Sequence, residues 1–335
     1  MAKVLMVSSN TDFSFEVWRH GTNFLLKHSA ELDIHGPHSL TDDPVEADLI
    51  LFAEMGTCGA FAEMVRAHPL YRHYPEKCFV FDSGDGLSPT VPGVYASLSK
   101  GQHRLGYTRT GFYLYLVENA FITHRPYTGN EKYLASFVGS RNTHPVRERL
   151  FEFGRRDIYV KDTSSYSQQM MYHGGTAERA DFWAEYADSI ADAKFSLCPR
   201  GRGSGSIRLF ESMKTGRACV IIADDWQPNK FINWSEFSIT VPENEAHRIP
   251  EILEQNEHRA AAMGIRARQA WEERFSEQAR FRYVVDLCLD LQKNIRNGRL
   301  QRAARILRHT ADPRQFRRYW SSKMNLYRNT GKFYW

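Results

Sequence analysis

The first part of the chain alternates short, continuous apolar runs with longer amphipathic stretches. The apolar runs fall at residues 3–7, 48–53 and 77–81; the first is rich in β-forming residues, and the other two have the length and composition of buried strands. Helical spacing of apolar side chains lies between them, at 13–27 and 59–68. Strands and helices in alternation predict a parallel sheet, in which ligands gather at the carboxyl ends of the strands.

A second series of the same kind follows a less regular, Gly-, Pro- and Tyr-rich stretch over residues 87–130. We expect strands at 133–138, 157–160, 193–198 and 217–223, and helices at 146–153, 176–189, 207–215, 249–255, 258–275 and 277–292. The sequence therefore predicts an N-terminal Rossmann-like domain over 1–128, a second over 129–290 and a tail over 291–335.

Composition agrees with a packed protein of two domains, because 335 residues with 42% hydrophobic and 25% charged side chains exclude a disordered or low-complexity chain. No apolar run approaches the roughly 18 residues that a membrane-spanning helix needs. The five cysteines form no C-x-x-C pair, which is typical of reduced thiols in a cytosolic protein. We therefore expect a cytoplasmic protein.

Charge is spread unevenly along this chain of net charge +5. Residues 291–335 hold 12 Lys and Arg and one acidic residue, Asp312, so the tail carries +11 and the rest of the chain −6. Seven aromatic residues are interleaved with these cations: Phe316, Tyr319, Trp320, Tyr327, Phe333, Tyr334 and Trp335. The pattern favours peripheral contact with the inner face of a membrane, or docking onto the acidic body or a second copy. A nucleic-acid partner is not expected, although basic and aromatic residues also bind nucleic acids.

The stretch most informative about chemistry covers residues 195–226, where a strand, a Gly-rich loop, a helix and a strand follow one another. Ser204 or Ser206 can cap the helix, and the amino end of a helix attracts anions. Arg208 lies in the first helical turn, where a cation opposes the helix dipole unless an anion is bound. Glu211 shares its face, and its carboxylate can accept two hydrogen bonds from a ribose diol.

Together these residues point to a nucleoside diphosphate, although an ordinary surface ion pair between Arg208 and Glu211 is the alternative. The chain contains no Asp-x-Asp triplet, so we expect arginines and backbone amides, without a metal or another cofactor, to balance the phosphates. Asp225, after the next strand, is a candidate ligand of sugar hydroxyls. Trp226 either stacks on a sugar or base or packs in the protein interior. Asp224 either faces the proposed site with Asp225 and Trp226 or caps a helix.

The same stretch resembles the C-terminal signature of exostosin-family (GT47-like) glycosyltransferases. The residues that carry the resemblance are 198–201, 206–211, Gly216, 219–222, Asp225, Pro228 and 232–238. Residues 136–139 with Arg147, and residues 43–48, resemble earlier elements of that family more weakly. The resemblance thus extends over roughly residues 40–255.

What the resemblance implies is an α/β protein of the GT-B fold, with two Rossmann-like domains facing across a cleft, here followed by a basic helical tail. It implies an inverting, metal-independent transfer from a UDP-sugar, with Arg208 on the diphosphate and Glu211 on the ribose. The donor-binding residues are then Gly139, Ser140, Arg141, Arg200, Gly203, Ser204, Gly205, Ser206, Arg208, Glu211 and Asp225. We expect a compact, soluble, bacterial-type member whose acceptor is a polysaccharide, a glycolipid or a natural product.

An inverting transfer also needs a base that deprotonates the acceptor hydroxyl. Acidic residues that follow strands of the first domain are the candidates, namely Glu54, Asp82 and Asp85, with Asp12 and His20 as further possibilities, although such acids also cap helices and turns. His35 and His38 form a pair without a third metal ligand. Two other functions stay open: a non-catalytic membrane- or RNA-binding module that uses the tail, and a GT-B enzyme with another nucleotide donor.

Overall fold

The protein is described here from a computed structural model, which places all residues except 9–16, 55–59, 116–117, 166–175, 296 and 332–335. The chain divides into two compact units, Met1–Leu116 with Arg274–Trp335, and Val117–Glu273. Each unit has its own apolar core, with Phe52 and Val80 in the first and Phe195 and Val220 in the second. The expected two-domain organisation therefore appears, with different boundaries.

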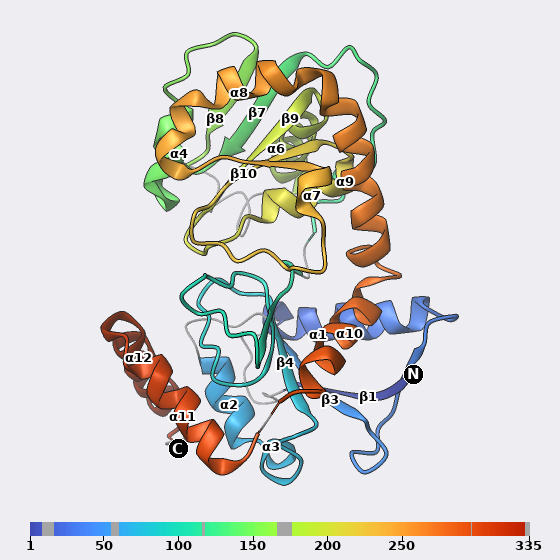
Figure 1. The fold of residues 1–335 in the computed structure, drawn as a ribbon, viewed down its shortest axis with the longest axis vertical. Helices are drawn as coiled ribbons and strands as arrows, with labels where there is room; N and C mark the ends of the chain where they lie inside the picture. The colour runs from blue at the N-terminus through green and yellow to red at the C-terminus, as the bar shows by residue number, and fades with distance from the viewer. Residues whose placement is uncertain (9–16, 55–59, 116–117, 166–175, 296, 332–335) are drawn as a thin grey trace. The chain divides into compact units, whose positions relative to one another are not determined.

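The first unit contains a six-stranded parallel sheet in the order β2-β1-β3-β4-β5-β6. Figure 1 labels three of its strands, β1, β3 and β4. Its strands are β1 (Ala2–Val7), β2 (His38–Leu40), β3 (Leu49–Glu54), β4 (Cys78–Asp82), β5 (Gly93–Tyr95) and β6 (Thr108–Thr110). The helices that follow them are α1 (Val17–Leu32), α2 (Ala60–Ala67) and α3 (Pro69–His73). Strands β3 and β4 are buried at every position, as their continuous apolar runs predict.

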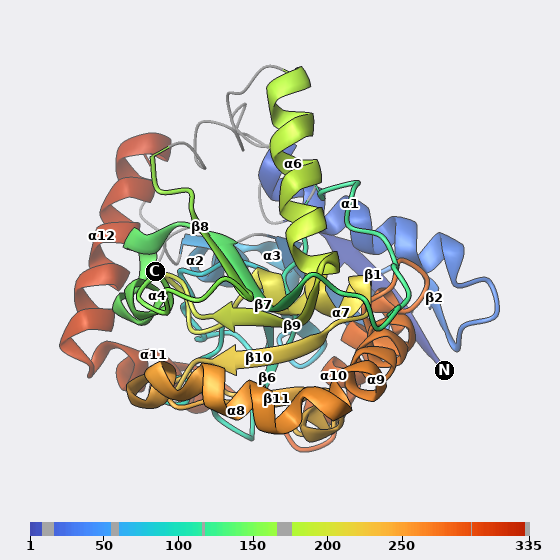
Figure 2. The same cartoon turned by 90° about the horizontal axis from the view of Figure 1, so that it is seen from above.

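The second unit contains a five-stranded parallel sheet in the order β11-β10-β9-β7-β8. Its strands are β7 (Tyr133–Gly139), β8 (Ile158–Asp162), β9 (Ala193–Pro199), β10 (Ala218–Ile222) and β11 (Ser238–Thr240). Its α-helices are α4 (Pro145–Leu150), α6 (Thr176–Ala191), α7 (Ile207–Thr215), α8 (Ile249–Asn256) and α9 (Ala260–Arg274). Figure 2 shows β7, β9 and β10 side by side as parallel arrows. Two parallel-sheet units of Rossmann type confirm the predicted α/β class and are the components of a GT-B fold.

The expected domain boundaries differ from those of the structure. The first unit ends at Leu116 rather than near residue 128, and the segment 274–290 belongs to the first unit rather than the second. The reason is the packing of α10 (Arg280–Gln292) against α1, β5 and β6. Within the first unit the Phe281 amide donates to Ser29 Oγ at 3.0 Å, and Arg109 Nη2 forms an ion pair with Asp290 Oδ2 at 2.6 Å.

The tail is helical, as expected, but it is not a separate body. Helices α11 (Arg299–Thr310) and α12 (Pro313–Thr330) belong to the first unit, where α12 lies beside α2 (Figure 1). His309 Nε2 lies 3.1 Å from Ser88 Oγ, and the Arg305 guanidinium lies over the Tyr107 ring at 4.8 Å. One side of the tail therefore docks onto the protein's own body. Within the described ranges, no helix is both long and apolar enough to cross a membrane.

Candidate functional site

Arg208 is buried against the strands of the second sheet rather than exposed at the surface. It is 3% exposed, and its Nε donates to Ser196 Oγ at 3.1 Å while its Nη2 donates to Ser136 Oγ at 3.0 Å. These serines come from the adjacent strands β9 and β7, so the guanidinium is held over the middle of the sheet. Its Nη1 is also buried and has no hydrogen-bond partner among the residues that the structure places. The alternative of a surface ion pair with Glu211 is therefore wrong.

Glu211 is partly exposed and is paired with a tyrosine that sequence reasoning missed. Tyr186 Oη, from α6, donates to Glu211 Oε2 at 2.5 Å, and the Arg208 guanidinium lies 5.1 Å from the centre of the Tyr186 ring. Burial raises the pKa of Glu211, while the Tyr186 hydrogen bond and the charge of Arg208 oppose that rise. Burial likewise raises the pKa of Tyr186 well above its usual value, so its hydroxyl stays a donor. No sequence motif marks Tyr186, because it lies on a different helix.

The Gly-rich loop packs closely at the amino end of α7. Gly203, Ser204, Gly205 and Ser206 are all buried, and Ser206 is the residue before the first helical turn. Its side chain makes no capping hydrogen bond, so the cap expected from Ser206 is not formed. The helix ends as predicted at Gly216, whose φ of 90° lies in the left-handed region that favours glycine.

Arg147 connects the two loops that carry residues predicted to bind the donor nucleotide. Its Nη1 donates to the Ser140 carbonyl at 3.1 Å, its Nε to the Arg200 carbonyl at 2.8 Å and its Nη2 to the Pro199 carbonyl at 3.3 Å. The carboxyl ends of β7 and β9 are thereby joined. Gly139 precedes Ser140 at the end of β7. A Cβ at this position would lie 2.8 Å from the Phe137 ring, so the close packing here favours glycine. Arg147 was part of the family resemblance, but its spacing in the sequence does not reveal this bridging role.

The other predicted arginines lie near acidic partners. Arg141 Nε lies 3.4 Å from Asp162 Oδ2, and its guanidinium lies 4.6 Å from the centre of the Phe151 ring. Arg200 Nη1 lies 4.0 Å from Asp225 Oδ2 and 3.9 Å from Glu243 Oε1. These separations are long for hydrogen bonds, so the cations are held loosely in place.

Asp224 and Trp226 have structural roles. Asp224 Oδ1 accepts a hydrogen bond from the Glu243 amide at 3.0 Å, and Glu243 Oε1 accepts one from the Asp224 amide at 3.0 Å. Trp226 is 4% exposed and packs edge-on against Trp234 with ring centres 5.0 Å apart. The interpretation of Trp226 as a platform for a sugar or base is therefore replaced by core packing, because its ring face is covered.

In the first unit, two candidate bases lie side by side. Glu54 and Asp82 end the adjacent strands β3 and β4 in register, and both are buried. Ser8 Oγ donates to Glu54 Oε1 at 3.2 Å, and the Gly84 amide donates to Asp82 Oδ1 at 2.9 Å. Asp85 is exposed and accepts a hydrogen bond from Tyr113 Oη at 2.8 Å.

The remaining candidates are less informative. Asp12 lies outside the described residues, and the side chain of His20 is not described either. His38 Nε2 lies 3.0 Å from Asp286 Oδ1, which gives the expected histidine pair a carboxylate partner. In the part of the chain that the structure describes, no three His, Cys, Asp or Glu side chains form a group that could hold a metal ion.

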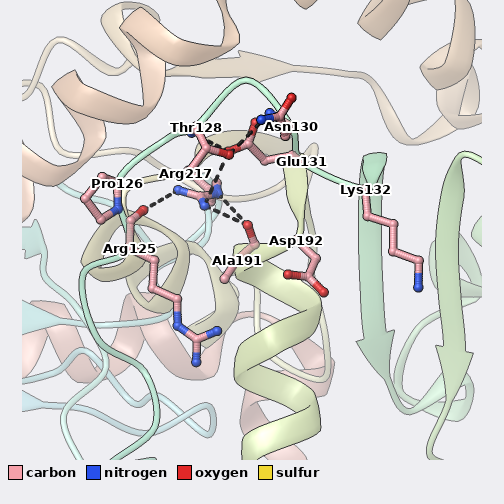
Figure 3. A pocket seen from close by; sticks show the side chains of 9 residues that line it. All are labelled: Arg125, Pro126, Thr128, Asn130, Glu131, Lys132, Ala191, Asp192 and Arg217. Atoms are coloured by element: carbon pink, nitrogen blue, oxygen red, sulfur yellow. Dashed lines mark hydrogen bonds and ion pairs between the residues drawn. The ribbon is translucent and has the colours of Figure 1, made fainter.

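A cavity of about 370 Å³ lies at the opposite end of the second sheet (Figure 3). Lys132, Asp192 and Arg217, which line it, directly precede β7, β9 and β10 and thus mark the amino ends of these strands. Arg217 is buried and donates to the carbonyls of Ala191 at 2.6 and 3.0 Å and of Arg125 at 2.6 Å. The Arg217 guanidinium therefore already donates to backbone carbonyls. Because ligands of parallel sheets gather at the carboxyl ends of the strands, we do not place a nucleotide in this cavity.

Comparison with known proteins bears on the second unit. Residues 118–256 match the model of the Exostosin GT47 domain. The Caenorhabditis elegans exostosin-1 homolog is 31% identical over 134 residues, which cover 36% of this chain and 35% of that protein. The probable glucuronoxylan glucuronosyltransferase IRX7 of Arabidopsis thaliana is 30% identical over 154 residues, which cover 41% and 33%.

Among solved structures, Anabaena Alr3699/HepE in complex with UDP-glucose aligns with this chain at a TM-score of 0.42 and 10% sequence identity. The alignment covers 88% of this chain and 99% of that one, and no inference is drawn from a likeness this low. The chain spans about a third of the length of the two curated relatives named above. All predicted donor-binding residues lie inside the matched segment. Residues 118–256 are therefore similar to the exostosin GT47 domain, in agreement with the resemblance that the sequence motifs carry.

Proposed function

We propose that this protein is a glycosyltransferase that binds a UDP-sugar in the unit Val117–Glu273 and transfers the sugar, without a metal ion, to a hydroxyl of a carbohydrate, a lipid-linked or a natural-product acceptor. The observation that carries this proposal is the group formed by Arg208, Glu211 and Tyr186 within a segment that matches the exostosin GT47 domain. A buried cation beside a half-buried carboxylate supplies both features that a nucleoside diphosphate requires.

In the proposed complex, Glu211 Oε1, which has no hydrogen-bond partner among the residues that the structure places, accepts hydrogen bonds from the ribose, while Tyr186 donates to Oε2. The positive charge of Arg208 attracts the diphosphate and opposes the rise that burial causes in the pKa of Glu211. Arg200 and Arg141, at the carboxyl ends of β9 and β7, are the further cations for the phosphates.

The proposed reaction inverts the anomeric carbon. A carboxylate takes the proton of the acceptor hydroxyl, whose oxygen attacks the anomeric carbon as the bond to UDP breaks. UDP leaves with the electron pair, and the cations around Arg208 stabilise its negative charge. Glu54, Asp82 and Asp85 are the candidates for the carboxylate, so Glu54→Gln, Asp82→Asn and Asp85→Asn each test one of them by loss of kcat with donor affinity retained.

The role of Glu211 is tested by calorimetric titration with UDP and 2′-deoxy-UDP. We expect Glu211→Gln to lower UDP affinity by roughly 10- to 100-fold, the range for a hydrogen bond to a charged group. Wild-type protein should also bind 2′-deoxy-UDP more weakly, whereas Glu211→Gln should lose little further affinity for it, because the partner of that hydroxyl is already weakened. Glu251→Gln, at a largely exposed position on α8, is the matched control.

Equal UDP affinity of wild type and Glu211→Gln would contradict the ribose role.

A panel of UDP-glucuronate, UDP-glucose, GDP and dTDP, compared by thermal shift, tests the base of the donor, since a bound ligand raises the melting temperature. Greater stabilisation by GDP or dTDP would replace the uridine assignment with another nucleotide donor.

Tyr186→Phe provides a test by pH. As pH falls through the raised pKa of Glu211, the carboxylate takes up a proton and UDP affinity should decrease. The Tyr186 hydrogen bond lowers that pKa, so Tyr186→Phe should raise it and move the acid limb of UDP binding to higher pH. Titration of UDP itself is common to both proteins and cancels in the comparison. Coincident pH profiles would show that Glu211 does not control binding.

A further inference from the structure

The outer side of α12 carries a row of large apolar side chains. Phe316, Trp320, Met324 and Tyr327 are between 37% and 47% exposed. Their spacing of four, four and three residues places them in one stripe along the helix. The rings of Phe316 and Trp320 meet edge-on with centres 6.2 Å apart. We call these four residues the α12 stripe. Contiguous exposed apolar side chains of this size mark an interaction surface.

The neighbouring side of α12 holds the helix in place. Arg66 Nη2 donates to Tyr319 Oη at 3.4 Å, and Lys323 Nζ lies 3.6 Å from Glu63 Oε2, with both α12 residues buried. Arg66 and Glu63 lie on α2. The contacts therefore hold α12 with Tyr319 and Lys323 toward α2, while the α12 stripe stays exposed.

The surroundings of the α12 stripe are cationic. Arg317 and Arg328 directly follow its first and last residues and are exposed, and Arg308 is exposed on α11. Across residues 299–330 the chain holds nine Lys and Arg and one acidic residue, Asp312. Helix α11 adds Leu300 and Leu307, which are 82% and 69% exposed. A partner that covers this surface must combine negative charge with an apolar layer.

We propose that the α12 stripe and its flanking arginines bind the headgroup region of an anionic lipid bilayer. Trp, Tyr and Phe side chains are stable at the boundary between headgroups and acyl chains, and arginines beside them pair with anionic lipids. A symmetric contact between two copies would instead bring the same arginines face to face, which repulsion opposes. This binding is independent of the donor site and would bring the enzyme to acceptors held at a membrane.

The test uses the full chain and sedimentation with vesicles of phosphatidylcholine, with or without about a third phosphatidylglycerol. Wild-type protein should bind the anionic vesicles and bind phosphatidylcholine alone far more weakly, and added salt should reduce binding. Phe316→Ser with Trp320→Ser should weaken binding at least roughly tenfold, as should Arg317→Glu with Arg328→Glu. The conservative Trp320→Phe should retain most of it.

The matched control is Ile265→Ser with Arg266→Glu, an exposed apolar–cationic neighbour pair on α9. We expect this variant to bind like wild type, and equal melting temperatures of all variants show that they fold. Equal vesicle binding by the stripe variants and the control overturns the proposal. Self-association of the wild type, but not of the stripe variants, in sedimentation velocity without lipid also overturns it. Tight binding of single-stranded RNA with no binding of anionic vesicles overturns it as well.

Discussion

Replacing Glu63 with alanine should destabilise the first unit by about 3–5 kcal/mol, the cost of leaving buried charges without their partner. Glu63 is 2% exposed on α2 and forms ion pairs with Arg66 of the same helix and with Lys323 of α12. Among the described residues, neither carboxylate oxygen finds a hydrogen-bond partner of ordinary geometry, so the attraction is mainly Coulombic. Removal of the carboxylate leaves two cations in a buried site without their anion. The apolar packing of the tail must then offset the whole cost of burying these charges.

Thermal and urea unfolding of the full chain measure this loss. Glu46→Ala is the control, because the pair of Glu46 with Lys3 is more than half exposed and should contribute little to stability. Glu63→Ala combined with Lys323→Met should recover part of the stability, since one of the stranded cations is then gone. A loss for Glu63→Ala no larger than that for Glu46→Ala would show that this cluster does not fasten the tail.

Arg208→Met should lower UDP affinity by roughly 100-fold or more, because one substitution removes the buried positive charge and a partner that favours the ionised form of Glu211. Arg208→Lys should fall between wild type and Arg208→Met. It keeps the charge but lacks the planar fork that reaches Ser196 and Ser136 together. Calorimetric titration with UDP measures both effects.

Arg208 is also a core residue, so its substitution needs a readout that separates binding from folding. The melting temperature should fall in Arg208→Met, since three serine hydroxyls around the guanidinium lose a partner. Arg248→Met, at an exposed ion pair with Glu245, is the control for both measurements. If the variant protein is folded below its lowered melting temperature and still binds UDP like wild type, Arg208 is a structural residue only.

Much of the fold follows from local pattern. The apolar runs of β3, β4, β9 and β10 were predicted within a few residues, because a strand buried on both faces needs a continuous apolar sequence. Four short strands, β2, β5, β6 and β11, were missed, since three residues carry no measurable periodicity. The helix 277–292 was predicted correctly but assigned to the wrong domain, because its apolar face matches any sheet equally well in the sequence.

The candidate site shows the same division. The strand, Gly-rich loop and helix around Arg208 are consecutive in the chain, so their order is visible in the sequence. The contacts of that site come from elsewhere: Tyr186 from α6, Ser136 from β7 and Arg147 from α4. No spacing rule connects these elements, because their approach depends on how the sheet brings β7 beside β9.

The sequence by itself determined the alternation of strands and helices, the order of strand, Gly-rich loop and helix around Arg208, and the basic, aromatic character of the tail, because each depends on neighbouring residues. Only the tertiary structure decided that Arg208 is buried over the sheet, that Glu211 shares its carboxylate with Tyr186, and that one side of α12 is fastened while the other stays exposed. The physical reason is that burial and pairing of charged groups are set by residues distant in the chain, which meet only when the sheets and helices pack.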